Sequence, residues 1–589
     1  MRPRPLHRLA GPAAVLAVVL AAVCEAQTFS TFVPAPDGSP LATDVYLPIG
    51  SGWGPWPVIL QRTPYGKDSG TVRDSCLLFT LWGYACVGQD ERGRGASGGH
   101  YTGYADEGTD GRATLDWIAS QWWCDGNVGA FGASALGMAQ YALAPGAPRA
   151  LKCMVPIVAT PDFYHHAVYQ GGALRYALTH GWLEGHDALD VFEQLKLHRL
   201  WDAWWEGFAV LPRVGDVDVP ALHVGGWFDI FLQGALDGFT EFQRRAGPGA
   251  AGKQKLIVGP WTHYGTFQTT AGQLAYPANA GFVTDIFPIV RDWFDFWLKG
   301  GSPGVARGSD VTVYLMGAVG EAAAPGNVWL ELQQWPPPAS QLALFLDAGH
   351  GLSEEPPPAA EVELVADPQD PVPTVGGQEL SSIAGPYDQR AVEGRRDVAT
   401  FTTEPLPAAL TVVGRVRCRL WVRSETPDLD LAVRLTDVYP DGRSMLVTDG
   451  IQRARMRCGD DRECFLTPGV ATEISVDLWS TALVFNAGHR IRISVSGSNW
   501  PRFEVNPNDG RDLSETSPGR FARSELLLGE SYPSRLELPV LRPSPFPRRH
   551  LTEGSAATSD VGVRTTGQGV VCPPGPDGGG GAVATLEAQ

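Results

Sequence analysis

The sequence predicts an α/β domain with a mostly parallel sheet, interrupted by a helical insertion and followed by a separate all-β domain. Three observations carry this prediction. Short apolar runs alternate with helix-like segments, residues 161–215 are rich in aromatic side chains, and period-two alternation begins beyond the prolines at 336–338. With 589 residues, 44% of them hydrophobic and 19% charged, the chain is long enough for several packed domains.

The predicted strands of the first domain are nearly continuous apolar runs, as expected when helices cover both faces of a parallel sheet. They lie at 57–61, 85–89, 127–131, 151–158, 221–226 and 255–258, with a helix-like segment at 113–121. We therefore assign residues 27–160 and 216–335 to this α/β domain.

The insertion, residues 161–215, carries aromatic residues at spacings compatible with helices. They are Phe163, Tyr164, Trp182, Trp201, Trp204, Trp205 and Phe208. Because aromatics at such spacing are most often core residues, we interpret the segment as a helical cap that packs over the sheet, and secondarily as a substrate lid.

The all-β domain is predicted at residues 336–545. Alternation at Leu431, Val433 and Leu435, and again at 491–495, indicates half-buried antiparallel strands. Many short strands separated by Gly and Pro favour a sandwich or jelly roll. Residues 546–589, which have no periodicity and contain the glycine run 578–581, are predicted to be a flexible tail.

Residues 1–26 have the layout of a signal peptide: basic residues, the apolar run 13–23, and Ala26 before the cleavage point. The run is shorter than the roughly 20 apolar residues of a membrane span. A lipoprotein is disfavoured because Val23 precedes Cys24 where a small residue is expected. We expect a secreted or periplasmic protein without stable membrane insertion.

Charge and cysteine content exclude several function classes. The formal net charge of −18 repels nucleic acid. Eight cysteines follow residue 26, and Cys458 with Cys464 frames a polar stretch that predicts a closed turn. No C-x-x-C pair occurs, and no ligand pattern completes a metal site around the histidines at 165, 166, 180 and 186. We therefore expect neither a metal nor a cofactor, whereas a homo-oligomer stays an open alternative.

The sharpest chemical signal is Ser134, which follows an apolar strand in a turn of small residues and precedes a helix-like segment at 138–144. This context is typical of a nucleophile elbow, although the spacing G-x-S-x-x-G is weak as a bare pattern. Asp229 and His263 follow two later predicted strands, in the order Ser, acid, His of α/β-hydrolases. Ser134, Asp229 and His263 each have an ordinary structural interpretation when taken singly. Together, in this order, they predict a catalytic triad.

At these residues the sequence resembles the cocaine esterase and X-Pro dipeptidyl-peptidase (CocE/NonD) hydrolases. The resemblance rests on the segments 123–129 (WCDGNVG), 226–229 (GWFD), 259–263 (GPWTH), 90–98 (DERGRGASG), 62–65 (RTPY) and 485–490 (FNAGHR). It implies an α/β-hydrolase fold with a helical cap and a C-terminal jelly roll of the galactose-binding-like type. It also implies an oxyanion hole formed by the Tyr65 hydroxyl and the backbone N–H of Ala135.

The family contains esterases, α-amino-acid ester hydrolases, acylases and dipeptidyl peptidases, which differ in how they hold the acyl side. Ile230, Phe231 and Leu232 follow Asp229, with no acidic cluster for a substrate ammonium group. We therefore expect a small-molecule ester with an apolar or aromatic acyl group as the substrate. The expected pocket residues are Trp227, Phe228, Phe231 and Trp261.

Two alternatives stay open. Asp162 and Glu184 in the cap could hold an ammonium group, which would fit an X-Pro dipeptidyl peptidase or an α-amino-acid ester hydrolase or acylase acting on an amide or ester. A non-catalytic secreted binding protein is the second alternative. Two departures from the family bear on specificity: Ala135 replaces a common aromatic residue, and Asp229 comes only 95 positions after Ser134, which implies a short cap.

Overall fold

The computed structural model describes residues 27–48, 52–302, 304, 308–321, 324–513 and 519–541. The predicted signal peptide (1–26) and tail (546–589) lie outside the described residues.

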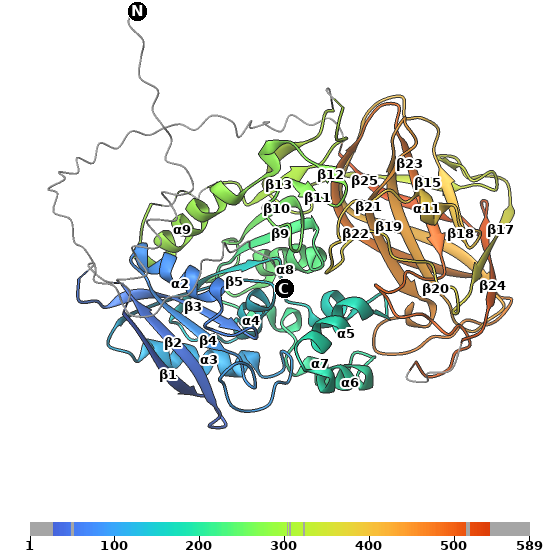
Figure 1. Cartoon of the computed structure of the whole chain (residues 1–589). Coiled ribbons are helices and arrows are strands. Elements are labelled where there is room, and N and C mark those ends of the chain that lie inside the picture. The colour runs from blue at the N-terminus through green and yellow to red at the C-terminus, as the bar shows by residue number, and fades with distance from the viewer. Residues whose placement is uncertain are drawn as a thin grey trace, which may run out of the picture. The chain divides into compact units, whose positions relative to one another are not determined.

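The α/β domain is built on a ten-stranded sheet in the order β1-β2-β4-β3-β5-β6-β9-β10-β13-β14 (Figure 1). The central pairs from β4 to β13 are parallel, and the outer pairs β1–β2, β2–β4 and β13–β14 are antiparallel. The strands are β1 Gln27–Pro34, β2 Pro40–Leu47, β3 Trp56–Thr63, β4 Ala85–Asp90, β5 Cys124–Ala133, β6 Leu151–Ile157, β9 Leu222–Phe228, β10 Lys255–Thr262, β13 Val311–Leu315 and β14 Val328–Leu332. The six strands expected from apolar runs are confirmed.

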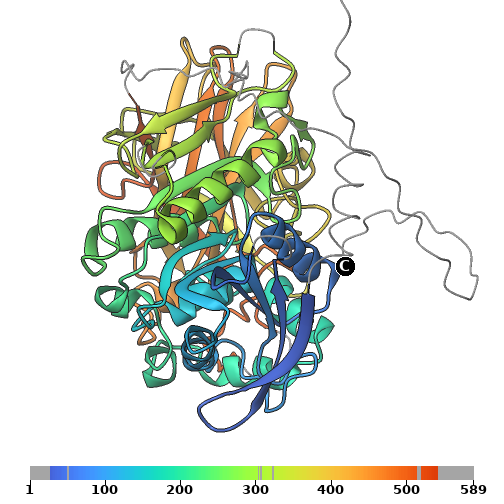
Figure 2. The same cartoon turned by 90° about the vertical axis from the view of Figure 1, so that its left-hand side faces the viewer.

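Helices cover both faces of this sheet, which explains why its strands are apolar throughout. They are α2 Gly70–Leu81, α3 Glu107–Ala119, α4 Ala135–Leu143, α8 Leu232–Arg245 and α9 Val283–Lys299, accompanied by the short elements β11 Thr270–Ala271, β12 Leu274–Ala275 and η3 Ala278–Ala280. Phe79 of α2, Phe131 of β5 and Phe294 of α9 pack with ring centroids 5.2–6.4 Å apart on one face. Ile59 joins that core, whereas Val58 and Leu60 join the core beneath α3 and α4, on the opposite face. Figure 2 shows helices on both sides of the sheet.

Helical elements occupy most of the predicted cap segment. They are η1 Phe163–Val168, α5 Tyr176–Gly185, α6 Leu189–Leu197, α7 Ala203–Glu206 and η2 Leu211–Asp216, with a two-residue pairing of β7 Tyr169–Gln170 and β8 Ala173–Leu174. An ion pair and a backbone hydrogen bond join the cap to the all-β domain. The Arg199 guanidinium lies 2.7 Å from the Glu504 carboxylate, and the Trp201 N–H donates to the Asp460 carbonyl at 2.7 Å.

The C-terminal part forms two antiparallel sheets, with strand orders β16-β15-β25-β19-β24-β17 (β22 also pairs with β19) and β18-β23-β20-β21. Their elements are β15 Ser340–Leu346, β16 Leu352–Ser353, β17 Ala360–Ala366, α11 Arg390–Glu393, β18 Val398–Thr402, β19 Leu410–Ser424, β20 Asp430–Val438, β21 Ser444–Arg453, η4 Ala454–Met456, β22 Thr472–Phe485, β23 Arg490–Ser496, β24 Ala522–Leu528 and β25 Arg535–Val540. The prediction of a half-buried strand is wrong for β20, which is buried along its whole length. Its polar face is covered too: the Thr436 hydroxyl meets the Glu393 carboxylate of α11 at 3.5 Å.

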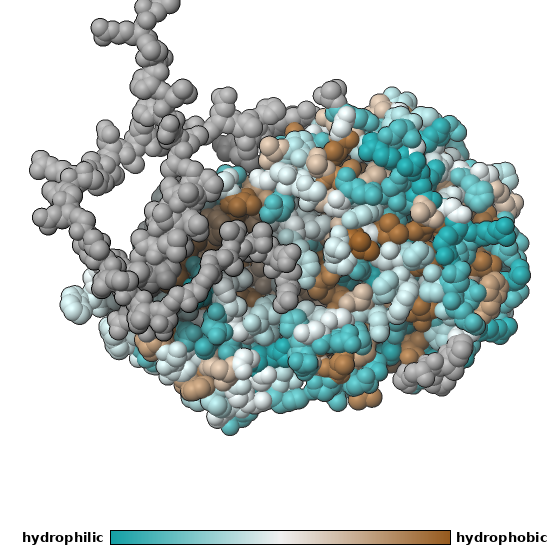
Figure 3. Space-filling model, viewed as in Figure 1, coloured by the Kyte–Doolittle hydropathy of each residue, from teal (hydrophilic) through white to brown (hydrophobic). Residues whose placement is uncertain are grey.

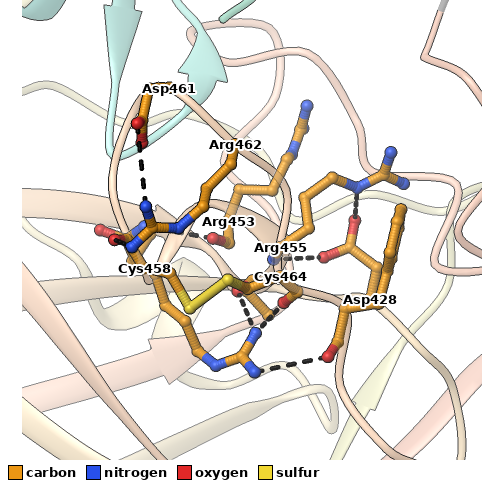
Figure 4. The surroundings of a disulfide bond; sticks show 11 residues. Asp428, Arg453, Arg455, Cys458, Asp461, Arg462 and Cys464 are labelled. Carbon is orange, nitrogen blue, oxygen red and sulfur yellow. Dashed lines mark hydrogen bonds and ion pairs between the residues drawn. A yellow bond between two sulfur atoms is a disulfide. The ribbon is translucent and has the colours of Figure 1, made fainter.

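The closed turn predicted at Cys458 and Cys464 is confirmed as a disulfide. Figure 4 shows this disulfide beside Arg453 and Arg455, and the Arg455 guanidinium pairs with Asp428 at 2.6 Å. A second disulfide joins Cys76 of α2 to Cys86 of β4. The disulfide-closed loop 458–464 therefore rests on buried ion pairs, which hold it in place beside the cap.

Hydrophilic residues predominate on the all-β domain in the view of Figure 3, with smaller hydrophobic areas between them. In the part of the chain that the structure describes, no helix has the length and apolar character of a membrane span.

Candidate active site

Ser134 sits on a sharp turn between β5 and α4. Its backbone has φ 57° and ψ −124°, a conformation that L-residues rarely adopt and that a nucleophile elbow requires. Small neighbours allow this turn: a Cβ on Gly132 would come within 2.4 Å of Leu136, and one on Gly137 within 2.6 Å of Ala159. The spacing G-x-S-x-x-G therefore follows from close packing of the turn and of the first turn of α4.

Asp229 and His263 come from the loops after β9 and β10, strands that are paired in parallel. His263 Nδ1 lies 2.6 Å from Asp229 Oδ2, and His263 Nε2 lies 2.9 Å from Ser134 Oγ. The other carboxylate oxygen of Asp229 accepts a hydrogen bond from the Phe231 N–H at 2.8 Å. The structure thus brings the three predicted residues into one hydrogen-bonded chain, with Asp229 fully buried and Ser134 at the surface of a cavity.

Tyr65 and Ala135 flank the serine. Ala135 is the first residue of α4, a position whose N–H has no intrahelical acceptor and where the helix dipole favours negative charge. The Tyr65 hydroxyl lies beside the Ser134 hydroxyl and accepts a hydrogen bond from Trp182 Nε1 at 3.2 Å. Burial raises the pKa of Tyr65 to about 12, so its hydroxyl stays a neutral hydrogen-bond donor at physiological pH.

Two buried acids lie beside the segment 62–65, which carries Tyr65. Glu107 forms two hydrogen bonds of 3.0 Å with Arg62. Glu91 is fully buried, and neither of its carboxylate oxygens has a hydrogen-bond partner among the described residues. Burial, together with the charge of Glu107, raises the pKa of Glu91 well above its ordinary value. The charge of Glu91 also contributes to the raised pKa of Tyr65.

A cavity of about 100 Å³ opens beside Ser134. Among the described residues its lining is apolar or aromatic apart from hydroxyl groups, and most of it comes from the cap. The lining includes Trp182, Phe163, Trp205, Phe208, Phe231 and Leu380. Leu380 belongs to the all-β part of the chain, which therefore completes the cavity.

The structure places only Phe231 of the four expected pocket residues in this lining, which corrects the prediction for Trp227, Phe228 and Trp261. These three residues lie in β9 and β10, where both faces are covered, and they point into the core. The Trp227 indole N–H donates to the Tyr314 carbonyl at 2.6 Å, and that of Trp261 donates to the Ala280 carbonyl at 2.9 Å.

Arg175 and Trp182 are two site residues that no sequence pattern indicates. The buried Arg175 guanidinium donates to the Ile230 carbonyl at 2.9 Å and thereby holds the loop that carries Asp229. Burial lowers the pKa of Arg175 to about 9, so the side chain remains charged at neutral pH. The aromatic spacing of the cap predicts a packing role for Trp182, yet its indole N–H donates to the Tyr65 hydroxyl and orients it. No spacing pattern in the cap distinguishes these two positions from core residues.

The fold and the site together define a class: an α/β-hydrolase-type domain with a Ser–His–Asp chain beside an apolar cavity, joined to an all-β domain. Such a chain can activate a serine hydroxyl for attack on a carbonyl group.

Comparison with known proteins identifies the family. The family model described as X-Pro dipeptidyl-peptidase (S15 family) matches residues 37–194 and 182–265, and that of the X-Pro dipeptidyl-peptidase C-terminal non-catalytic domain matches 303–537. Cocaine esterase from Rhodococcus sp. (strain MB1 Bresler) is 31% identical over 579 residues, covering 87% of this chain and 98% of that protein. The chain belongs to this CocE/NonD family and is a serine hydrolase.

Solved structures agree at the level of the fold. An aminopeptidase from a marine sediment archaeon, Thaumarchaeota archaeon, superposes with a TM-score of 0.75 at 23% identity, over 88% of this chain and 97% of that one. An α-amino acid ester hydrolase gives a TM-score of 0.74 at 24% identity, with the same coverage of both chains.

Proposed function

We propose that the protein is an exported carboxylic ester hydrolase in which Ser134 is the nucleophile, His263 the general base and Asp229 the residue that orients His263. The observation that carries this proposal is the continuous hydrogen-bonded chain from Asp229 through His263 to Ser134 at the edge of an apolar cavity. Cocaine esterase, the relative at 31% identity, is by name an esterase, which supports the same assignment.

The geometry supports an acyl-serine mechanism. His263 Nε2 takes the proton of the Ser134 hydroxyl as its oxygen attacks the ester carbonyl, while Nδ1–H donates to Asp229. The developing oxyanion accepts hydrogen bonds from the Tyr65 O–H and the Ala135 N–H. His263 then gives its proton to the leaving alcohol, and a water molecule, activated by the same imidazole, hydrolyses the acyl-serine.

The cavity favours an uncharged apolar or aromatic acyl group. Its lining, as far as the described residues form it, contains no carboxylate that could hold a substrate ammonium ion. Asp162 is instead paired with His165 at 2.8 Å, and the exposed Glu184 lies 3.7 Å from His180. The dipeptidyl-peptidase and amino-acid ester hydrolase alternatives therefore have less support at this site. A non-catalytic binding protein would have no need for the complete hydrogen-bonded chain.

Two further parts of the proposal concern the whole chain. Export is supported by the two disulfides, since such bonds persist in oxidising compartments, and by the signal-peptide pattern at 1–26. The assignment of the all-β domain as a galactose-binding-like jelly roll stays a prediction. Leu380 of the all-β domain lines the cavity, which supports a role of this domain in shaping the acyl site.

The test is hydrolysis of three substrates by the purified mature chain and by its Ser134→Ala variant: a p-nitrophenyl acyl ester, an α-amino-acid p-nitrophenyl ester and a Gly-Pro anilide. We expect the acyl ester to have the highest kcat/KM, and the activity to be lost in the variant. Preference for the Gly-Pro anilide would instead assign a dipeptidyl peptidase. Equal inactivity of both proteins would favour the binding-protein alternative.

A further inference from the structure

Two cavities lie back to back in the cap. The first is the cavity of about 100 Å³ beside Ser134, and the second, of about 490 Å³, lies between the cap, α8 and β19. Three side chains line both cavities: Phe163, Trp205 and Phe208. The wall between the two cavities is therefore the thickness of one aromatic ring.

The three rings of this wall differ in burial and in the contacts that fix their positions. Trp205 is buried, and its indole N–H donates to the His198 carbonyl at 2.8 Å. Phe163 is buried and stacks on Tyr104, with centroids 4.9 Å apart and ring planes 2° from parallel.

Phe208 is only half-buried; its ring packs against the core of the cap and against Trp204 at 4.9 Å, Trp205 at 5.6 Å and Phe163 at 6.2 Å. A phenyl ring has no hydrogen-bonding group that could fix it further. Of the three wall residues, Phe208 is therefore the one whose ring a substrate can move, or a substitution can remove, at the lowest cost in free energy.

The size of the first cavity limits the acyl group that fits without displacing the wall. Its volume of about 100 Å³ compares with about 490 Å³ for the second cavity. A short acyl chain therefore fits in the first cavity, whereas a longer straight chain must pass the wall.

The second cavity can receive the end of such a chain. Ala209, Val210 and Leu211 give it apolar surface beside the wall. Its charged groups are paired: the Arg415 guanidinium lies 3.4 Å from the Asp237 carboxylate, and that of Arg245 lies 2.5 Å from Glu241. Because these charges neutralise one another, the cavity favours an uncharged chain over an ionic ligand.

We propose that Phe208 sets the acyl chain length that the enzyme accepts, and that the cavity behind it is an extension of the acyl site that Phe208 keeps closed. This inference rests on the proposed esterase function. The wild-type protein prefers short acyl esters, and removal of the Phe208 ring joins the two cavities and admits longer chains.

The experiment measures kcat/KM for p-nitrophenyl butanoate and p-nitrophenyl octanoate with the full mature chain and three variants: Phe208→Ala, Phe208→Leu and Leu197→Ala. Leu197 is 74% exposed on α6 and lies outside both cavity linings, so it controls for a general disturbance of the cap. We expect the octanoate-to-butanoate ratio to rise about 10-fold or more in Phe208→Ala, to rise less in Phe208→Leu, and not to change in Leu197→Ala. If Phe208→Ala does not fold, the Phe208→Leu result decides.

An unchanged ratio in the folded Phe208 variants, or a wild-type protein that already prefers octanoate, would overturn the assignment of Phe208 while leaving the esterase function intact. A wild-type protein that hydrolyses neither ester would contradict the proposed function itself, and the chain-length assignment with it.

Discussion

The catalytic loops and the cap wall face the same cavity but are built in different ways. Ser134, Asp229 and His263 follow the ends of sheet strands, and their backbones are tied to the sheet: the Ser134 N–H donates to the Ile157 carbonyl, and the Asp229 N–H to the Gly226 carbonyl. The wall is made of rings on short cap helices and, for Phe208, in the turn after α7, and it depends on side-chain packing. Hydrogen bonds thus hold the catalytic residues, whereas side-chain packing forms the wall, so changes to the Phe208 ring should leave the hydrogen-bonded chain unaffected.

The largest effect is expected for Asp229→Asn. The amide side chain would favour the wrong tautomer of His263, so kcat should fall by about 10⁴-fold, equally for short and long acyl esters. Steady-state kinetics with the two esters, alongside Asp285→Asn as an exposed control on α9, measure this. A loss of less than 10-fold, or one that depends on acyl length, would contradict the separation of chemistry from selectivity.

A smaller effect is expected for Tyr65→Phe, which removes one hydrogen-bond donor of the proposed oxyanion hole. We expect kcat to fall about 10²- to 10³-fold for every ester. Because the pKa of Tyr65 is raised to about 12, the wild-type hydroxyl should still donate at about pH 10, where an ordinary tyrosine is half ionised.

The measurement is kcat from about pH 7 to pH 10.5, with Tyr532→Phe in the all-β domain as the matched control. A wild-type kcat that falls with a midpoint near pH 10, while Tyr65→Phe shows no such fall, would place the pKa of Tyr65 at its ordinary value and refute this account of its surroundings.

The smallest effect concerns the attachment of the cap. His165 lies 2.8 Å from Asp162 and 2.9 Å from Asp460, which belongs to the disulfide-closed loop 458–464. Burial by itself would lower the pKa of His165, but hydrogen bonds to the two carboxylates outweigh it and raise the pKa to about 10. The stabilisation from protonated His165 is therefore complete below about pH 6.5 and is lost as the pH rises through 10.

Urea unfolding at about pH 6.5 and about pH 10 tests this prediction. The free energy of unfolding should fall between these pH values by more in the wild-type protein than in His165→Gln, by about 1 kcal/mol or less because His165 is partly exposed. His100→Gln, at a more exposed ion pair with Asp190, should behave like the wild-type protein. Equal pH dependence of the wild-type and His165→Gln proteins would show that this bridge does not stabilise the cap.

The difference between the catalytic loops and the cap wall also explains which parts of the site the sequence predicts. Six strands of the α/β domain and the positions of Ser134, Asp229 and His263 are predictable, because buried parallel strands are apolar runs and catalytic loops follow them in a fixed order. The strands β1, β2, β13 and β14 are not identified, because polar residues interrupt their apolar runs.

Closeness in sequence to the catalytic residues does not identify the residues that line the cavity. Trp227 and Trp261 stand close to Asp229 and His263 in the chain, but strands covered on both faces send these indoles into the core. The cavity is lined instead by cap residues such as Phe208 and by Leu380, which follows Ser134 by more than 200 positions. Contacts between such distant segments arise only in the folded protein and leave no periodic signal.

The most direct test of the central claim, that Ser134 is the nucleophile, is covalent labelling of the purified mature chain with a fluorophosphonate, followed by peptide mass spectrometry. We predict one adduct per chain, located on Ser134, and no adduct in Ser134→Ala or after heat unfolding. Labelling of another serine, or equal labelling of the Ser134→Ala variant, would contradict the account.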